Sequence, residues 1–287
     1  MPPIPVPEPA ITYHANITPP GVLAQPRAIG VARLVAKTRG RLSVIGDLHQ
    51  AGSSRLLFPR SDAGLTGVLL NTAGGMTGGD RFAVSGTAQD ASRLTLTTQA
   101  AERVYRAQPG TEARLTTTLR AGAAARIDWL PQETILYDHS ALRRSLDVHL
   151  AADAVFLAVE PLVFGRAAMG EVLNVATLHD RVRVWRDDAL IFADQTRICG
   201  PVHALLQSPF TAGGAGAMAA VIYAAPDAEG FLAPLRALLP PACGISPIRP
   251  GVLFARLLAA DSYELRKILV PLSTTLNRAP LPRVWTL

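Results

Sequence analysis

A glycine-rich stretch at residues 69–82, LLNTAGGMTGGDRF, carries the first pattern that could do chemistry. Its glycines at 74 and 79 have the spacing of a phosphate-binding loop, but Asp80 and Arg81 stand where that loop has Lys and Ser or Thr. A carboxylate repels phosphate, and the following FAVSG predicts a strand, so no helix N-terminus is expected to bind an anion. The pattern indicates either a tight turn that presents Asp80 at its exit or a plain hairpin with an exposed aspartate. The turn residues are Gly74, Gly75, Gly78 and Gly79.

Three further acids lie in apolar or turn-forming surroundings. They are Glu133 in WLPQETILYD, Glu160 in LAVEPLVF and Asp194 in ALIFADQTRI. Burying a carboxylate costs several kcal/mol, on the order of 2–7, unless it is paired, protonated or in contact with water or metal. Each of these acids is therefore a candidate for a polar passage through the interior. The alternative, a salt bridge to one of the many arginines, is the commoner outcome for a single buried acid.

Local motifs for tight metal binding or covalent catalysis are missing from the sequence. It contains no H-E-x-x-H, His-x-His or Cys/His cluster, and no G-x-S-x-G. Asp147 and His149 lie two apart and are expected on one strand face, where solvated surface is the usual role. A small-molecule enzyme of unknown type, with acids in a β-rich cleft, remains an alternative.

From about Arg33 to Arg197, the region that must position these acids, apolar and polar residues alternate with a period of two. Residues 93–98, 114–120, 125–129, 146–150 and 181–184 alternate apolar and polar side chains, which predicts strands with one wet face. Many short strands separated by Gly, Pro and Asp turns favour stacked antiparallel sheets. The nearly continuous apolar run at residues 154–164 predicts a strand buried on both faces.

In the C-terminal part, the spacing of apolar residues changes from alternation to a helical period in two segments. Residues 229–239 and 261–279 predict helices, and residues 219–225 and 252–260 predict strands before them, which gives a β-α-β-α C-terminal part. Asp261 and Glu264 have capping-box spacing at the start of the second helix. Residues 198–226 lack charged side chains, but Pro and Gly interrupt them, so a loop and a buried strand are expected instead of a membrane span.

Composition restricts the class of partner and compartment. The formal net charge of +6 favours acidic partners, but the basic residues are scattered in sequence and aromatic residues make up 6%. A basic RNA-binding module is thus weakly supported, and neither a nucleic-acid nor a membrane partner is expected. The two cysteines are far apart, which argues against a disulfide scaffold and favours a cytoplasmic setting. Residues 1–26 are Pro-rich without a basic start, so we expect a disordered lead-in and no signal peptide.

Five segments in order resemble the UreD (UreH) family of urease accessory proteins. They are LLNTAGGMTGGDRF, LTLTTQAAERVYRA, IDWLPQETILYD, VFGRAAMGE and PRVWTL, and the resemblance covers most of residues 27–287. Residues 71–73, Asn-Thr-Ala, depart from a His-Pro-Pro run of many relatives, which changes the lead-in to the glycine turn. The resemblance implies one β-rich domain over residues 27–287: mainly β, with stacked sheets in a β-helical scaffold and a few C-terminal helices.

The resemblance also implies a non-enzymatic function in urease maturation. Such a protein would dock on apo-urease, recruit an F-type accessory protein and through it a G-type GTPase, and pass nickel through its interior toward the urease active site. No tightly bound cofactor is implied, only transient nickel. Isolated carboxylates with water would release nickel more readily than clustered imidazole or thiolate ligands. The acids expected along this passage, three of them matched by the resemblance, are Asp80, Glu133, Glu160, Glu171 and Asp194.

Overall fold

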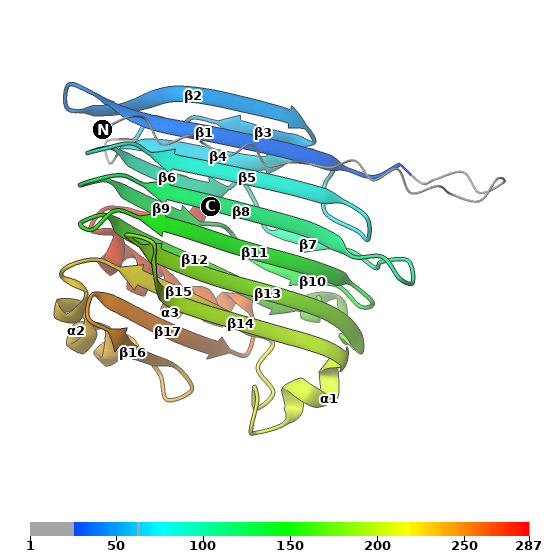
Figure 1. Ribbon diagram of the computed structural model, residues 1–287. Coiled ribbons are helices and arrows are strands. Elements are labelled where there is room, and N and C mark those ends of the chain that lie inside the picture. The colour runs from blue at the N-terminus through cyan, green and yellow to red at the C-terminus, as the bar shows by residue number, and fades with distance from the viewer. Residues whose placement is uncertain (1–25, 62–63, 287) are drawn as a thin grey trace.

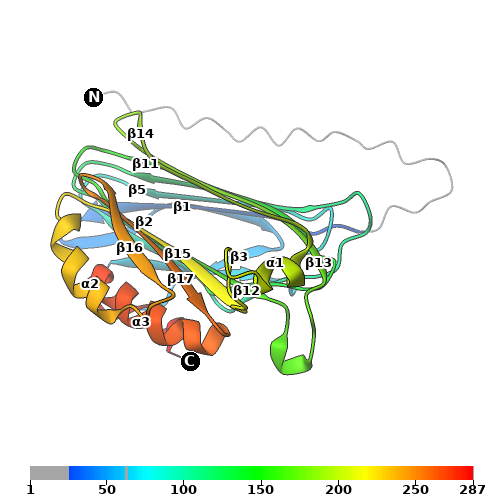
Figure 2. The same cartoon turned by 90° about the horizontal axis from the view of Figure 1, so that it is seen from below.

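The computed structural model describes residues 26–61 and 64–286. In this part of the chain two β-sheets face one another, and helices cover the outer side of one of them (Figures 1 and 2). The mainly β class with a few helices near the C-terminus is confirmed. The N-terminal segment predicted to be disordered is residues 1–26, and all of it except Pro26 lies outside the described residues.

We call the two sheets sheet A and sheet B. Sheet A consists, in spatial order, of β14 (Ala189–Pro201), β13 (Val175–Arg186), β11 (Ala141–Leu150), β8 (Ala113–Ala121), β5 (Arg81–Ala88), β1 (Ile29–Arg39) and β2 (Leu42–Gly52). Sheet B consists of β16 (Gly244–Arg249), β17 (Val252–Ala259), β15 (Ala217–Ala224), β12 (Val155–Phe164), β9 (Arg126–Leu130), β6 (Arg93–Thr98), β4 (Leu65–Asn71) and β3 (Ser54–Leu57). The short strands β10 (Thr134–Leu136) and β7 (Glu102–Val104) extend sheet B beside β12.

The chain winds as a solenoid, placing successive long strands in alternate sheets. Along β4, β5, β6, β8, β9, β11, β12 and β13 it alternates between sheet B and sheet A, so neighbours in the centre of each sheet run parallel. The expectation of antiparallel sheets is therefore wrong for the centre and correct at the edges, where pairs such as β1 with β2 and β13 with β14 are antiparallel. Alternating side chains identify a half-buried strand but not its direction, and here the turns lead to the opposite sheet.

The main hydrophobic core fills the space between the sheets. Side chains such as Leu34, Leu96, Ile127 and Phe156 meet there, each from a different strand. The outer face of sheet A is wet, which explains the alternating pattern of its strands. The outer face of sheet B packs on helices, so β12 is buried on both sides, as its apolar run predicts.

Three helices of the described chain follow strands of the two sheets: α1 (Val202–Gln207) comes after β14 of sheet A, and α2 (Leu232–Leu238) and α3 (Ser262–Asn277) come after β15 and β17 of sheet B. The 3-10 turns are η1 (Ala167–Met169), η2 (Ala228–Phe231) and η3 (Arg283–Trp285). The predicted helices and strands of the C-terminal part are present, but β16 is an additional strand before β17, and α1 lies in the segment expected to be loop. Neither was predicted, because β16 contains Pro247 and α1 lies in a segment that Pro201, Pro209 and several glycines interrupt.

Helix α3 is fixed at both ends. Asp261 caps its start by accepting a hydrogen bond from the backbone N of Glu264 at 2.9 Å. At its end Arg126 Nη2 donates to the carbonyl of Leu276 at 3.1 Å, and the fully buried Asp128 holds Arg126 at 2.8 Å. None of the helices in the described chain has the length and apolar character needed to cross a membrane.

Candidate functional site

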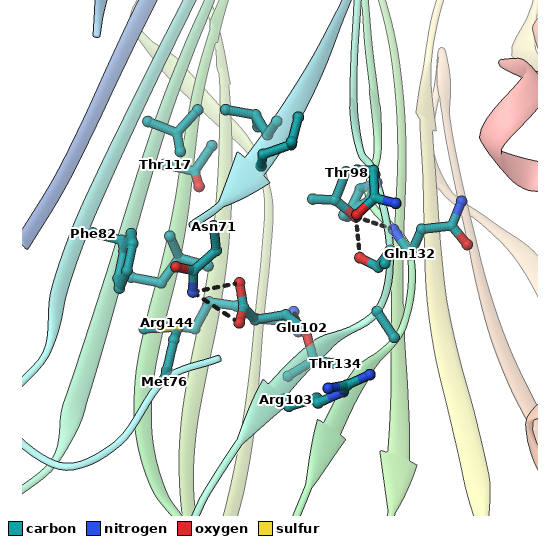
Figure 3. Close-up of a pocket in the computed structure, with 18 of the residues that line it drawn as sticks. Asn71, Met76, Phe82, Thr98, Glu102, Arg103, Thr117, Gln132, Thr134 and Arg144 are labelled. Atoms are coloured by element: carbon teal, nitrogen blue, oxygen red, sulfur yellow. Dashed lines mark hydrogen bonds between the residues drawn. The ribbon is translucent and has the colours of Figure 1, made fainter. Parts of the chain in front are cut away.

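A cavity of about 220 Å³ lies between the sheets, near the C-terminal ends of β4, β6 and β9 and beside β7 and β10 (Figure 3). Part of its wall is apolar, from residues such as Phe82 and Leu146. Its polar lining side chains include Asn71, Thr98, Glu102, Gln132, Thr134, Arg144 and Glu160. A polar cavity inside a β core is an arrangement in which water and a cation can be accommodated.

Glu102 is the acid at one side of this cavity. Strand β7 pairs with β10, and the backbone N of Glu102 donates to the carbonyl of Glu133 at 2.8 Å, which fixes the position of the side chain. Asn71 Nδ2 donates to the two carboxylate oxygens of Glu102 at 3.1 and 3.3 Å (Figure 3). In the described part of the chain no Lys or Arg forms an ion pair with Glu102. Burial raises its pKa to about 7, against the lowering effect of the Asn71 hydrogen bond.

At the deep side of the cavity, Arg144 joins two carboxylates from opposite sheets. Its Nη1 lies 2.7 Å from Glu160 Oε2 on β12, and its Nη2 lies 2.5 Å from Asp180 Oδ2 on β13. All three residues are at most 8% exposed. Trp129 Nε1 donates to the other Glu160 oxygen at 2.7 Å. Burial nevertheless raises the pKa of Glu160 to about 7, because the charge of Arg144 compensates only in part.

The glycine turn lies at the outer end of the cavity. Gly74, Gly75 and Gly79 have φ of 78°, 150° and 94°, backbone conformations that an L side chain rarely adopts. A Cβ on Gly78 would lie 2.0 Å from Thr111 Oγ1, so this glycine is needed for close approach. Gly75 and Met76 line both the cavity and a second, more open pocket on the outside, which Asp80 also lines.

Asp80 organises this turn and is buried. Its Oδ1 accepts a hydrogen bond from the backbone N of Ala28 at 2.9 Å, and its Oδ2 accepts one from the backbone N of Thr77 at 2.8 Å. The exposed aspartate of the plain-hairpin alternative is therefore not what the structure shows, since Asp80 is 4% exposed. The Asp80 side chain thus stabilises the turn through Thr77 and connects it to Ala28, just before β1.

The other predicted acids lie outside the cavity lining and contact arginines. Glu133 Oε1 lies 2.6 Å from Arg266, Glu171 Oε2 lies 3.0 Å from Arg166, and Asp194 Oδ2 lies 2.7 Å from Arg256. Glu133, Glu160 and Asp194 thus form the arginine pairs that the sequence left open as the alternative, and Glu171 forms one as well. Their transient binding of nickel stays a prediction. The structure brings Glu160 alone of the five to the inner cavity.

Glu102 was missed by reasoning from the sequence. Apolar neighbours mark the predicted acids, whereas Glu102, the first residue of the three-residue strand β7, lies between Ala101 and Arg103. Arg103 is exposed but also contributes to the cavity lining, so a charged neighbour in the sequence does not exclude an acid from the cavity. No group of three or more His, Cys, Asp or Glu side chains with metal-binding geometry occurs in residues 26–61 and 64–286.

Asp147 and His149 have surface roles in the structure. Asp147 lies 3.3 Å from Arg181 Nη2 and 2.9 Å from Arg183 Nε, and the ring of His149 stacks on Trp185 with the centroids 4.8 Å apart. They therefore do not converge on a shared ligand position, in agreement with the solvated-surface interpretation.

Comparison with known proteins decides the family. The family model described as UreD urease accessory protein matches residues 28–286. The chain belongs to the UreD family of urease accessory proteins. It is 50% identical over 255 residues to the urease accessory protein UreD of Ruegeria pomeroyi, covering 88% of this chain and 99% of that protein. Identity is 46% to UreD of Roseobacter denitrificans (92% and 97% covered) and 44% to UreD of Rhizobium leguminosarum bv. viciae (91% and 96%).

Two of the sequence segments that resemble UreD meet beside the cavity. Trp285 Nε1 donates to the carbonyl of Leu130 at 3.0 Å, and Gln132 Nε2 donates to the carbonyl of Val284 at 3.1 Å. The C-terminal PRVW segment thus fixes the LPQE segment, whose Gln132 lines the cavity. The segments that mark this UreD-family chain in sequence therefore help to build one wall of the cavity.

The hydrogen bonds of Asp80 lead to a prediction about stability. Asp80→Ala is expected to lower the free energy of unfolding by about 1–2 kcal/mol, because two buried backbone N–H groups lose their acceptor. Urea denaturation measures this change. Asp47→Ala is the matched control: Asp47 lies 3.4 Å from Arg33 with 58% of its side chain exposed, and its replacement should change stability by less than about 0.5 kcal/mol. Equal effects of the two substitutions would remove the organising role of Asp80.

Proposed function

We propose that this UreD-family chain is a non-enzymatic scaffold that passes nickel to apo-urease during urease maturation, and that the ion travels through the cavity between the two sheets. The observation that supports the proposal most directly is Glu102, a cavity carboxylate that has Asn71 as its hydrogen-bond partner and no ion pair in the described chain. The family name supports the urease context.

The charges around the cavity favour Glu102 over Glu160 as the group that contacts the cargo. Arg144 occupies one oxygen of Glu160 and Trp129 the other, which leaves little capacity for a cation. Glu102 forms no ion pair with a cationic side chain of the described chain. Its pKa of about 7 leaves it partly deprotonated near neutral pH, where a cation can replace its proton. A single carboxylate with an amide neighbour binds Ni²⁺ weakly enough to release it.

The size of the cavity agrees with a hydrated ion. The cavity measures about 220 Å³, which is room for several waters. A cation beside Glu102 can therefore keep part of its water shell.

The alternative of a small-molecule enzyme would have to rely on the carboxylates of the cavity. Its lining, as far as the structure describes it, contains no His or Cys, so Glu102 or Glu160 would have to serve as the general acid or base. We extend the proposal to the partners implied by the family resemblance: apo-urease, an F-type accessory protein and, through it, a G-type GTPase.

A complementation experiment tests the proposal. We expect that co-expression of this chain with a urease operon lacking its own D-type gene restores urease activity and urease nickel content. The empty vector is the control for background activation. Soluble protein that restores neither quantity would contradict the function, whereas activity in a substrate panel without partners would favour an enzyme.

A further inference from the structure

The outer face of sheet A carries a row of basic side chains that runs across five neighbouring strands. The strand register places Arg81 on β5 opposite Arg114 on β8, Arg114 opposite Arg143 on β11, Arg143 opposite His179 on β13, and His179 opposite Arg197 on β14. We call these five residues the basic row. In the sequence they are scattered over more than a hundred positions, and the solenoid places them opposite one another on neighbouring strands.

The basic row is poorly neutralised within the molecule. Glu112 lies 2.9 Å from Arg114 and 2.8 Å from Arg143, whose side chains remain 57% and 48% exposed. In the described part of the chain, Arg81 and Arg197 form no ion pair, and both are exposed. Like charges opposite one another on neighbouring strands destabilise a sheet. The row is therefore a cost to the isolated fold that an external acidic surface would offset.

Nothing in the described chain covers this face. Helices α2 and α3 pack on sheet B, on the far side of the molecule from the outer face of sheet A (Figures 1 and 2). Helix α1 contacts β13 and β14, but its Val202 packs with the inward side chains Leu178 and Ile198. The inward neighbours in the row's strands, such as Phe82, Leu142 and Ile198, are buried, which confirms that the basic side chains point outward. The result is an exposed and positively charged surface.

We propose that the basic row is a docking surface for a partner protein that presents an α-helix with a stripe of carboxylates. Neighbouring strands are about 4.8 Å apart, so the five positions span about 19 Å. On a helix, residues about three or four apart lie on one face with a pitch of about 5.4 Å, and a stripe of five covers about 21 Å. A helix lying across the strands thus places one carboxylate near each basic side chain. This inference does not depend on the nickel passage.

Two other occupants fit less well. Residues 1–25 of this chain contain one carboxylate, Glu8, and cannot neutralise the row. A single-stranded nucleic acid usually stacks bases on aromatic side chains. Trp185 on the same face is six residues along β13 from His179, about 20 Å away. The row therefore offers charge without a stacking surface.

Charge reversal at the ends of the row tests the proposal. The variant Arg81→Glu/Arg197→Glu changes two side chains without ion pairs and leaves the contacts of Glu112 intact, so folding should be preserved. The matched control is Arg39→Glu/Arg41→Glu at the β1–β2 hairpin, which makes the same change of net charge at exposed positions away from the row. Urea denaturation of both variants verifies that each is folded.

The probe is a synthetic helical peptide with glutamates on one face, compared with a peptide of equal composition whose glutamates are distributed around the helix. By fluorescence anisotropy we expect the striped peptide to bind the full-length chain, with an affinity that falls as salt rises. The row variant should bind about ten-fold more weakly and the hairpin variant within about two-fold of the original. Equal losses in both variants, equal binding of both peptides, or tighter binding of an oligothymidylate than of the striped peptide would overturn the proposal.

Discussion

Replacing Arg144 with methionine is expected to lower the free energy of unfolding by about 3–5 kcal/mol. Arg144 is the cation between two buried carboxylates, Glu160 and Asp180, which come from opposite sheets. Burial alone would lower the pKa of Arg144, but the charges of Asp180 and Glu160 outweigh it and raise the pKa above its ordinary value. The large loss arises because two acids would remain in the core without a counter-charge.

Arg143 provides a control on the same strand. Its side chain points to the opposite, exposed face and contacts Glu112. Arg143→Met should cost less than about 1 kcal/mol, as is usual for exposed ion pairs. Urea denaturation of both variants measures the difference. Similar losses for Arg143 and Arg144 would mean that the buried triad contributes no more than a surface pair.

Replacing Glu102 with glutamine is expected to stabilise the protein at pH 8 while impairing urease maturation. The pKa of Glu102 is about 7 in the folded protein and 4.5 ordinarily, so the folded state favours the protonated side chain. Its contribution to stability is fully present below about pH 4.5 and is lost as pH rises to about 7. Glutamine avoids this loss, keeps an acceptor for Asn71, and should raise stability at pH 8 by about 2–3 kcal/mol.

Denaturation midpoints at pH 5 and pH 8 measure this effect, and the advantage of the variant should shrink at the lower pH. In the co-expression experiment the same variant should lower the nickel content of urease to under about half, because the cavity loses its unpaired carboxylate. Glu264→Gln is the matched control: Glu264 is an exposed helix residue that contacts Lys267. Full nickel content with Glu102→Gln would exclude Glu102 from the route.

The sequence predicted the strands and helices better than their arrangement. Alternation of side chains marked β6, β8, β9, β11 and β13, and the apolar run marked β12, because burial of one or both faces imposes these patterns directly. The direction of pairing depends on where each turn leads, which composition does not encode. The prediction of antiparallel sheets was wrong in the centre for that reason.

The sequence predicted that acids lie buried in the β-rich core, but not which of them line the cavity. Apolar neighbours in the sequence correctly pointed to Glu160 but gave no sign of Glu102, which contacts Asn71 at the end of β4 and pairs with β10, both distant in the sequence. The scattered arginines gave no sign of the basic row, since it exists only through register. Contacts between residues far apart in the chain, and not local patterns, decide which acids face the cavity and which face an arginine.

The solenoid winding has a consequence for how the chain can change in length. Each coil of the solenoid adds one strand to each sheet, and residues paired across neighbouring strands form a row. On β11, Arg143 and Arg144 lie on opposite faces of the sheet. Deleting one residue early in β11 would exchange inside and outside for the rest of the strand. Insertions and deletions should therefore accumulate at the bends between strands during evolution, where they leave both faces unaltered.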